Sequence, residues 1–109
     1  MIVSELCKMP EFTPVTPPET LNKEISGVYV CDLLSWVMSH AKKGDVWITV
    51  HTHMNIAAVA LLTEAACIII PEGIDTEEST VKKATDEDIA ILRSNLSAYE
   101  ICSVLSKIV

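Results

Sequence analysis

Glycine is scarce in this sequence: Gly27, Gly44 and Gly73 are the only three. A P-loop, G-x-x-x-x-G-K-[ST], and a dinucleotide-binding turn, G-x-G-x-x-G, both need glycines a few residues apart. Neither spacing occurs here, so the sequence excludes a P-loop NTPase and a Rossmann dehydrogenase. Phosphoryl transfer from ATP would also lack the loop that holds the phosphates.

Basic residues are few as well, eight against fifteen acidic ones, which gives a formal net charge of −7. Binding to nucleic acid depends on neutralising phosphates with Lys and Arg, so we expect no nucleic-acid partner. The same charge disfavours anionic membrane surfaces. The longest apolar stretch, residues 56–62, is far shorter than the ~20 residues that span a bilayer. No basic segment followed by an apolar one opens the sequence, so we expect a cytoplasmic protein without a secretory signal.

The four cysteines form no C-x-x-C pair, which makes a zinc site or a disulfide framework a poor interpretation. Cys67 precedes three isoleucines and Cys102 lies on an apolar helical stripe, so both are expected to be buried in a reducing compartment. Cys31, ahead of Asp32, is the one thiol that a helix N-terminus could activate, but we favour the interpretation as a structural cysteine at a strand end. We expect no cofactor.

Apolar strands alternate with helices along the rest of the chain. The predicted strands are residues 24–31, 46–50, 67–70 and 89–92. The predicted helices run from Leu33 to Gly44, from Asn55 to about Glu64, from Asp75 to about Ala84, and onward from a Ser97–Glu100 capping box. Such an alternation implies right-handed crossovers and a mostly parallel sheet covered on both sides. The sequence therefore predicts an α/β fold, a three-layer sandwich in a single domain.

Prolines set the first segment apart. Four of them fall between residues 10 and 18, and we expect a short helix over residues 4–9 and an extended edge segment over residues 12–16, because proline cannot donate to a central ladder. A proline-rich segment, residues 1–23, thus precedes an α/β core, residues 24–108. In the helix predicted from Leu33, Asp32 is the expected N-cap. Four apolar residues with the spacing i, i+3, i+4, i+7 predict the buried face of this helix: Leu34, Val37, Met38 and Ala41.

Polar residues follow each predicted strand. Ligands of open α/β sheets collect outside the carboxyl ends of the strands, where helix N-termini offer free N–H groups to phosphate or carboxylate. We therefore predict a shallow ligand-binding pocket for a nucleotide or small anion at this edge. Its candidate residues are Asp32, Ser35, His51, Thr52, His53, Asn55, Glu72, Arg93, Ser94 and Ser97.

The segment His51-Thr52-His53 is the centre of the predicted pocket, because residues two apart in an extended segment point to the same side. Three interpretations are open: a metal pair that needs a third ligand, an acid–base couple with Glu72 or Asp32, or imidazoles that cap backbone or bind an anion. We favour anion or nucleotide binding by neutral imidazoles. The serines near this edge have local roles and none lies in G-x-S-x-G, so we expect neither a hydrolytic triad nor an enzyme.

Two helices carry more apolar surface than one contact needs. Residues 56–62 are apolar all round, and the helix after Leu33 has a second apolar stripe that ends at His40, a residue suited to the negative end of the helix dipole. Excess apolar surface on a small domain favours a twofold dimer, although a covering loop is the alternative. The predicted interface residues are Leu33, Trp36, His40, Ala57 and Leu61.

Three stretches resemble small proteins of the DRTGG family. They are G-x-Y-V-C-D-L-L-S-W-V-M from Gly27, G-D-x-W-I-T-x-H-T-H-x-N-I from Gly44, and L-S-A-Y-E from Leu96. Related domains occur in phosphotransacetylases and CBS-domain pyrophosphatases, and are similar to the N-terminal domain of HPr kinase/phosphorylase. The resemblance implies an α/β fold, dimerisation and a regulatory role without catalysis. The D-R-T-G-G string itself is absent, and its nearest equivalent is E-I-S-G-V at residues 24–28.

Three functional hypotheses follow. The first is a homodimeric regulatory module that senses a nucleotide or small anion. The second is an interaction subunit whose whole task is dimerisation and docking to another protein. The third is a small metal-assisted hydrolase that uses His51, His53 and a carboxylate.

Overall fold

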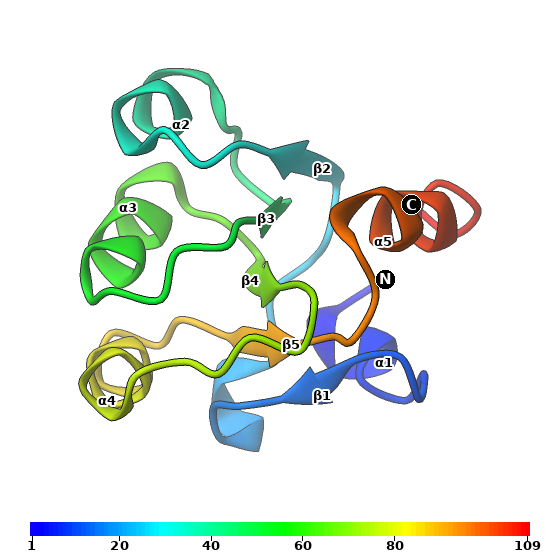
Figure 1. The fold of residues 1–109 in the computed structure, drawn as a ribbon, viewed down its shortest axis with the longest axis horizontal. Coiled ribbons are helices and arrows are strands. Elements are labelled where there is room, and N and C mark those ends of the chain that lie inside the picture. The colour runs from blue at the N-terminus through cyan, green and yellow to red at the C-terminus, as the bar shows by residue number, and fades with distance from the viewer.

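Four parallel strands and one antiparallel edge strand form the sheet of the computed structural model, which describes residues 1–109 (Figure 1). The strands lie in the order β1-β5-β4-β3-β2, and only β1 is antiparallel to its neighbour. Their bounds are β1 (Thr13–Pro14), β2 (Gly27–Val30), β3 (Asp45–Ile48), β4 (Cys67–Ile70) and β5 (Ile91–Arg93). The predicted α/β class and mostly parallel sheet are confirmed.

Helices cover both faces of this sheet (Figure 1). One face packs against α2 (Leu34–His40), α3 (Asn55–Thr63) and α4 (Glu78–Asp86). The other packs against α1 (Val3–Leu6) and α5 (Ala98–Leu105). The predicted three-layer sandwich is therefore confirmed. None of these helices has the length and apolar composition needed to cross a bilayer.

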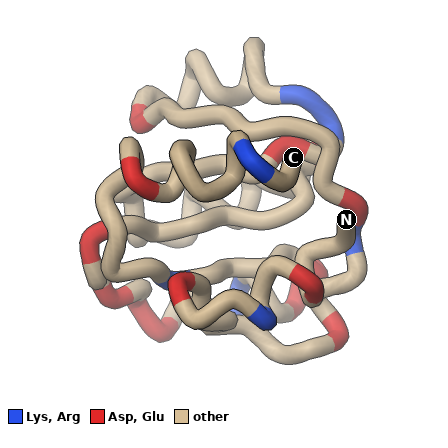
Figure 2. The backbone as a smooth tube through the Cα atoms, turned by 90° about the vertical axis from the view of Figure 1, so that its right-hand side faces the viewer, with Lys and Arg blue, Asp and Glu red and all other residues tan.

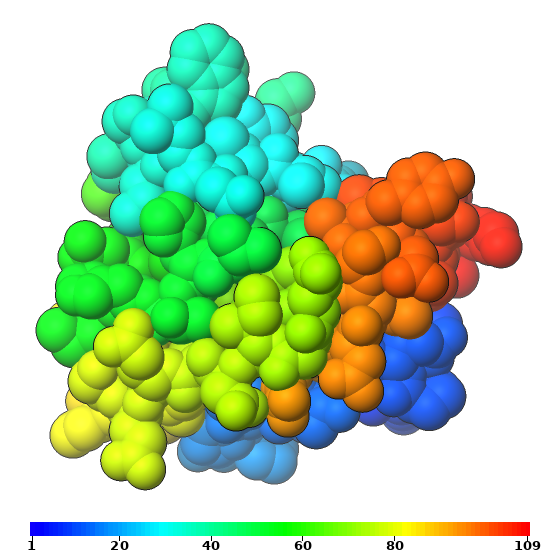
Figure 3. All heavy atoms as spheres, viewed as in Figure 1, coloured from blue at the N-terminus to red at the C-terminus, as the bar shows by residue number.

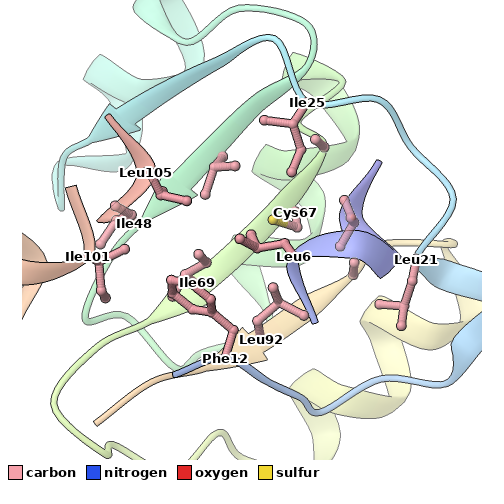
Figure 4. Close-up of a cluster of buried hydrophobic side chains, with 14 residues drawn as sticks. Leu6, Phe12, Leu21, Ile25, Ile48, Cys67, Ile69, Leu92, Ile101 and Leu105 are labelled. Carbon is pink, nitrogen blue, oxygen red and sulfur yellow. The ribbon is translucent and has the colours of Figure 1, made fainter. Parts of the chain in front are cut away.

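The two central strands are buried at every position, which explains their continuous apolar sequences. Side chains alternate between the faces: Ile68 and Ile70 pack toward α2, α3 and α4, whereas Cys67 and Ile69 pack toward α1 and α5. Figure 4 shows the cluster of buried side chains on the face covered by α1 and α5, in which Ile101 and Leu105 of α5 pack against the strands. Fully burying each such side chain contributes about 1.5–3 kcal/mol.

The N-terminal segment packs into the same core. Leu6, Phe12 and Leu21 are buried in the cluster of Figure 4. The predicted extended edge segment contains β1, which places a proline on an edge strand as expected. The buried Thr16 hydroxyl accepts a hydrogen bond from the Ile91 N–H at 3.1 Å, so this segment is joined to β5 beyond the short strand.

Several helix ends differ from the sequence prediction. The N-cap of α2 is Leu33 and not Asp32, whose carboxylate bonds another loop instead. Asn55 is the first residue of α3 and makes no side-chain cap. Met38 was predicted on the buried face, but it is 48% exposed, and Val37 is the only buried residue of α2. Gly44 lies beyond the end of α2, immediately before β3, where its positive φ of 85° makes the turn.

The acidic helix α4 begins at Glu78, three residues later than predicted. Residues 71–77 instead form a loop that contains Gly73 at φ 68° and contacts the end of β5. The capping box of α5 is confirmed: the Ser97 hydroxyl accepts from the Glu100 N–H at 3.2 Å, and the Glu100 carboxylate accepts from the Ser97 N–H at 3.1 Å.

The fully buried Cys67 leads to a pH-dependent prediction. Burial raises the pKa of its thiol well above the ordinary value. An unfolded chain ionises cysteine above about pH 8.5, whereas the folded chain keeps the proton, so folding stability falls as the pH rises above that value. We expect up to about 1.4 kcal/mol of lost stability per pH unit.

Urea unfolding under reducing conditions, at several values between pH 7 and pH 10, measures this effect. Cys67→Ala removes the thiol and serves as the comparison, because the other titrating groups remain. The wild-type protein should lose stability more steeply than Cys67→Ala above about pH 8.5. Parallel pH profiles for the two proteins would contradict the prediction.

Candidate functional site

The carboxyl ends of the four parallel strands lie level at one edge of the sheet. In the parallel register, Val30 lies beside Ile48, Ile48 beside Ile69, and Ile70 beside Arg93. The loops that follow are therefore neighbours, and Figure 3 shows the green, yellow-green and orange segments after β3, β4 and β5 together on one face. The sequence prediction placed its ten candidate residues in these loops.

Asp32 joins the first two loops. Its carboxylate accepts hydrogen bonds from the Thr49 hydroxyl at 2.8 Å and from the Val50 N–H at 3.0 Å. The His51 ring donates from Nε2 to the Asp32 carbonyl, and the His51 N–H donates to Thr49 Oγ1 at 3.3 Å. Asp32 and His51 thus have structural partners, and their bonds hold the loop after β2 to the loop after β3.

The two histidines do not form a metal site with a carboxylate. The Nε2 of His51 donates a hydrogen bond to the Asp32 carbonyl. His53 is exposed, and its Nδ1 accepts a hydrogen bond from the Asn55 N–H at 3.2 Å. No three or more His, Cys, Asp or Glu side chains are placed to hold a metal ion together. A zinc site needs at least three protein ligands, so the geometry does not support the metal-assisted hydrolase.

Thr52 connects its loop to α4. Its hydroxyl donates to a Glu77 carboxylate oxygen at 3.2 Å, and its carbonyl accepts from the buried Thr80 hydroxyl. Sequence reasoning missed Glu77 and Thr80, because both contacts span more than twenty residues and no local motif marks them. Ser35, in the first turn of α2, is exposed, and its carbonyl accepts from Ser39.

Arg93, at the end of β5, contacts the loop that follows β4. Its Nη2 donates to the Gly73 carbonyl at 2.7 Å and lies 3.4 Å from Asp75 Oδ1. Ser94 is 2% exposed, and its hydroxyl accepts from the Leu96 N–H at 3.2 Å. Glu72 is exposed, and its N–H donates to the Leu96 carbonyl at 2.8 Å. The loops after β4 and β5 are therefore bound to each other.

A cavity of about 140 Å³ lies at this end of β5. It is lined by Pro10, Glu11, Thr13, Arg93, Ser94, Asn95 and Leu96. Only Arg93 and Ser94 belong to the ten predicted residues; the other eight do not line it. Glu11 and Thr13 reach the cavity because β1 pairs with β5, and the sequence marked this segment only as a proline-containing edge.

The predicted interface residues divide into exposed and buried ones. Leu33, Trp36, His40 and Leu61 are exposed, and the rings of Trp36 and His40 stack at a centroid distance of 3.9 Å. His40 is the last residue of α2, as expected for an imidazole at the negative end of the helix dipole. The prediction of Ala57 as an interface residue is wrong, because Ala57 is 0% exposed and packs toward the sheet.

Charged side chains are spread over the surface. In the view of Figure 2, lysine and arginine positions are separated by acidic and uncharged segments. Several basic side chains pair with acidic neighbours, including Lys82 with Asp86 at 3.1 Å and Lys83 with Glu87 at 3.0 Å. These exposed pairs contribute little to stability, roughly 0.3–0.5 kcal/mol each.

No known family model matches this sequence, and no curated protein does. A solved structure does match: the CBS and DRTGG domains of the regulatory region of a Clostridium perfringens pyrophosphatase, in complex with the activator diadenosine tetraphosphate. The TM-score is 0.72 and the sequence identity 12%, over 94% of this chain. This chain has a DRTGG-like fold. It covers 45% of the matched chain, less than half of that regulatory region.

In this DRTGG-like fold, the segment most similar to the D-R-T-G-G string lies at the amino end of β2, away from the carboxyl ends of the strands. A Cβ on Gly27 would lie 2.6 Å from Asp45 Oδ1, so glycine allows β2 to approach that carboxylate. The Ser26 hydroxyl donates to the Lys43 carbonyl at 3.1 Å. These contacts join β2 to the turn before β3 and have a structural role.

Proposed function

We propose that this chain is a non-catalytic regulatory module that binds a nucleotide or a small anion at the carboxyl ends of its strands. The observation that carries the proposal is the likeness in fold to a regulatory region that was solved with a nucleotide activator. The register supports the location, because it gathers the loops after four strands at one edge. The helices α3, α4 and α5 begin at that edge, and their first N–H groups favour negative charge.

The hydrogen bonds of the candidate residues support a binding role over a catalytic one. The carboxylate of Asp32 and the ring of His51 are engaged in bonds between loops, and Ser97 is used as a helix cap. A nucleophile needs a base within hydrogen-bond reach. No serine hydroxyl at this edge makes a hydrogen bond to His51 or His53.

A thermal-shift screen tests the proposal. The panel contains adenine and guanine nucleotides, inorganic phosphate and divalent metals. A ligand at a hundredfold excess over its Kd should stabilise the protein by ~2.7 kcal/mol, because it binds only the folded state. Arg93→Met, which removes the cation at this edge, should reduce the shift. A panel without any stabilising ligand would remove the basis of the proposal.

The alternative function is an interaction subunit, and the exposed apolar side chains on two neighbouring helices favour it. Trp36 of α2 is 51% exposed and Leu62 of α3 is 72% exposed, and Leu33, Met38 and Leu61 are exposed as well. The helices α2 and α3 pack side by side on the same face of the sheet, so one partner surface against this layer would cover side chains of both helices. A twofold dimer through this region is part of both functions.

We expect light scattering after size exclusion to give twice the monomer mass at micromolar concentration. Trp36→Glu should shift the protein to the monomer, because it places a charge in the proposed interface. Tyr99→Glu is the matched control, since Tyr99 is an exposed aromatic residue on α5, in the opposite layer. A monomeric wild-type protein, or equal effects of the two substitutions, would argue against this interface.

A further inference from the structure

Three buried side-chain atoms have no hydrogen-bond partner: Glu11 Oε1, Thr76 Oγ1 and Arg93 Nε. Glu11 and Arg93 line the same 140 Å³ cavity at the carboxyl end of β5. Thr76 directly follows Asp75, whose carboxylate lies 3.4 Å from Arg93 Nη2. Buried polar groups in folded proteins nearly always have partners. Two such exceptions in the lining of one cavity, with a third in the adjoining loop, point to a ligand that completes these hydrogen bonds.

The lining and the size of this cavity limit the ligand. Leu96 and the prolyl ring of Pro10 are its main apolar surfaces, and the remaining residues, Glu11, Thr13, Arg93, Ser94 and Asn95, are polar. A cavity of about 150 Å³ holds a molecule the size of benzene. The space at β5 therefore takes one small ring, and a sugar or phosphate attached to that ring would remain outside.

The charges beside the cavity select against a simple ion. Glu11 and Arg93 make no ion pair with each other, and the ion pair of Arg93 is with Asp75. A bare anion would be repelled by the Glu11 and Asp75 carboxylates, and a cation would be repelled by the Arg93 guanidinium. A neutral ring with a hydrogen-bond donor next to an acceptor satisfies Glu11 and Arg93 at once.

We infer that this cavity, between the segment before β1 and the loop after β5, is a nucleobase-binding site. The base edge donates to Glu11 and accepts from Arg93 Nε, and the flanking Ser94 and Asn95 complete the lining. The inference rests on the proposed function and makes it more specific: the base is held at β5 and the phosphates lie toward the solvent. Nucleobases are uncharged rings with adjacent donors and acceptors, as this lining requires.

Titration with nucleosides tests the inference, because they carry the base without phosphate. We expect cytidine, whose base is a single ring with a donor next to an acceptor, to shift the amide NMR signals of Glu11, Ser94 and Asn95, and inorganic phosphate to leave them unchanged. Glu11→Leu removes the acceptor and should weaken nucleoside affinity on the order of tenfold or more. Glu11→Gln keeps a carbonyl oxygen and should stay within about threefold of wild type. Glu19→Leu, an exposed carboxylate in the same N-terminal segment, is the control.

The outcomes separate the inference from the proposed function. If a nucleotide binds but Glu11→Leu leaves its affinity unchanged, the base is held elsewhere and the inference fails while the proposed function stands. If nucleosides do not bind and inorganic phosphate alone stabilises the protein, the site recognises an anion and the inference again fails. If Glu11→Gln weakens binding as much as Glu11→Leu, a cationic group occupies the cavity and the nucleobase assignment is wrong. If no ligand binds at all, both fail.

Discussion

Trp47→Ala should lower the free energy of unfolding by about 3–5 kcal/mol, the range for removing a large buried aromatic side chain. Trp47 lies in β3, between β2 and β4, and is 0% exposed. It packs in the cluster under α2 and α3, and its indole N–H donates to the Cys31 carbonyl at 2.9 Å. The substitution thus opens a cavity in the core and removes the bond that holds the chain between β2 and α2.

Urea unfolding followed by circular dichroism measures this change. Trp47→Phe is the matched variant, because it keeps an aromatic ring but cannot donate to the Cys31 carbonyl. We expect it to cost less than Trp47→Ala, with part of the cost, roughly 1–3 kcal/mol, arising from the unpaired carbonyl. A loss below about 1 kcal/mol for Trp47→Ala would mean that the site collapses around the smaller side chain.

Gly44→Ala should cost about 3 kcal/mol, a sum of backbone strain and close contact. Gly44 has φ 85°, a conformation that costs an L-residue roughly 1–2 kcal/mol. A Cβ there would lie 2.2 Å from Ser26 Oγ and 3.3 Å from Ser26 Cβ. Relief requires moving Ser26, whose hydroxyl donates to the Lys43 carbonyl, and overpacking of this kind costs about 1–3 kcal/mol.

Two further variants separate the cost of backbone strain from the cost of close contact with Ser26. In a Ser26→Ala background the nearest atom is absent, so Gly44→Ala should cost less than it does in the wild type. Gly73→Ala has a similar φ of 68°, but its new Cβ would meet only the side-chain atoms of Asn95 and Arg93 at 3.0 Å or more. We expect Gly73→Ala to cost about 1–2 kcal/mol, mainly from backbone strain. Equal losses at both glycines would show that the contact with Ser26 contributes nothing.

The candidate site was only partly predictable from the sequence. The rule that loops gather at the carboxyl ends of parallel strands placed Arg93 and Ser94 at the edge that contains a cavity. The same rule grouped them with Asp32 and His51, which the structure engages in bonds between other loops. A spacing pattern indicates which edge a residue lies at but not which polar groups pair there. That pairing depends on loop conformations, such as the positive φ of Glu72 and Gly73.

Local patterns in the sequence determined the order of strands and helices, the burial of β3 and β4, and the capping box of α5, because each depends on residues a few positions apart. The tertiary structure alone decided that Glu11 and Arg93 line one cavity, that the Trp47 indole N–H donates to the Cys31 carbonyl before α2, and that Ala57 is enclosed. These contacts join residues far apart in the chain. They arise only when the antiparallel edge strand and the helices pack on the sheet, which no short-range periodicity encodes.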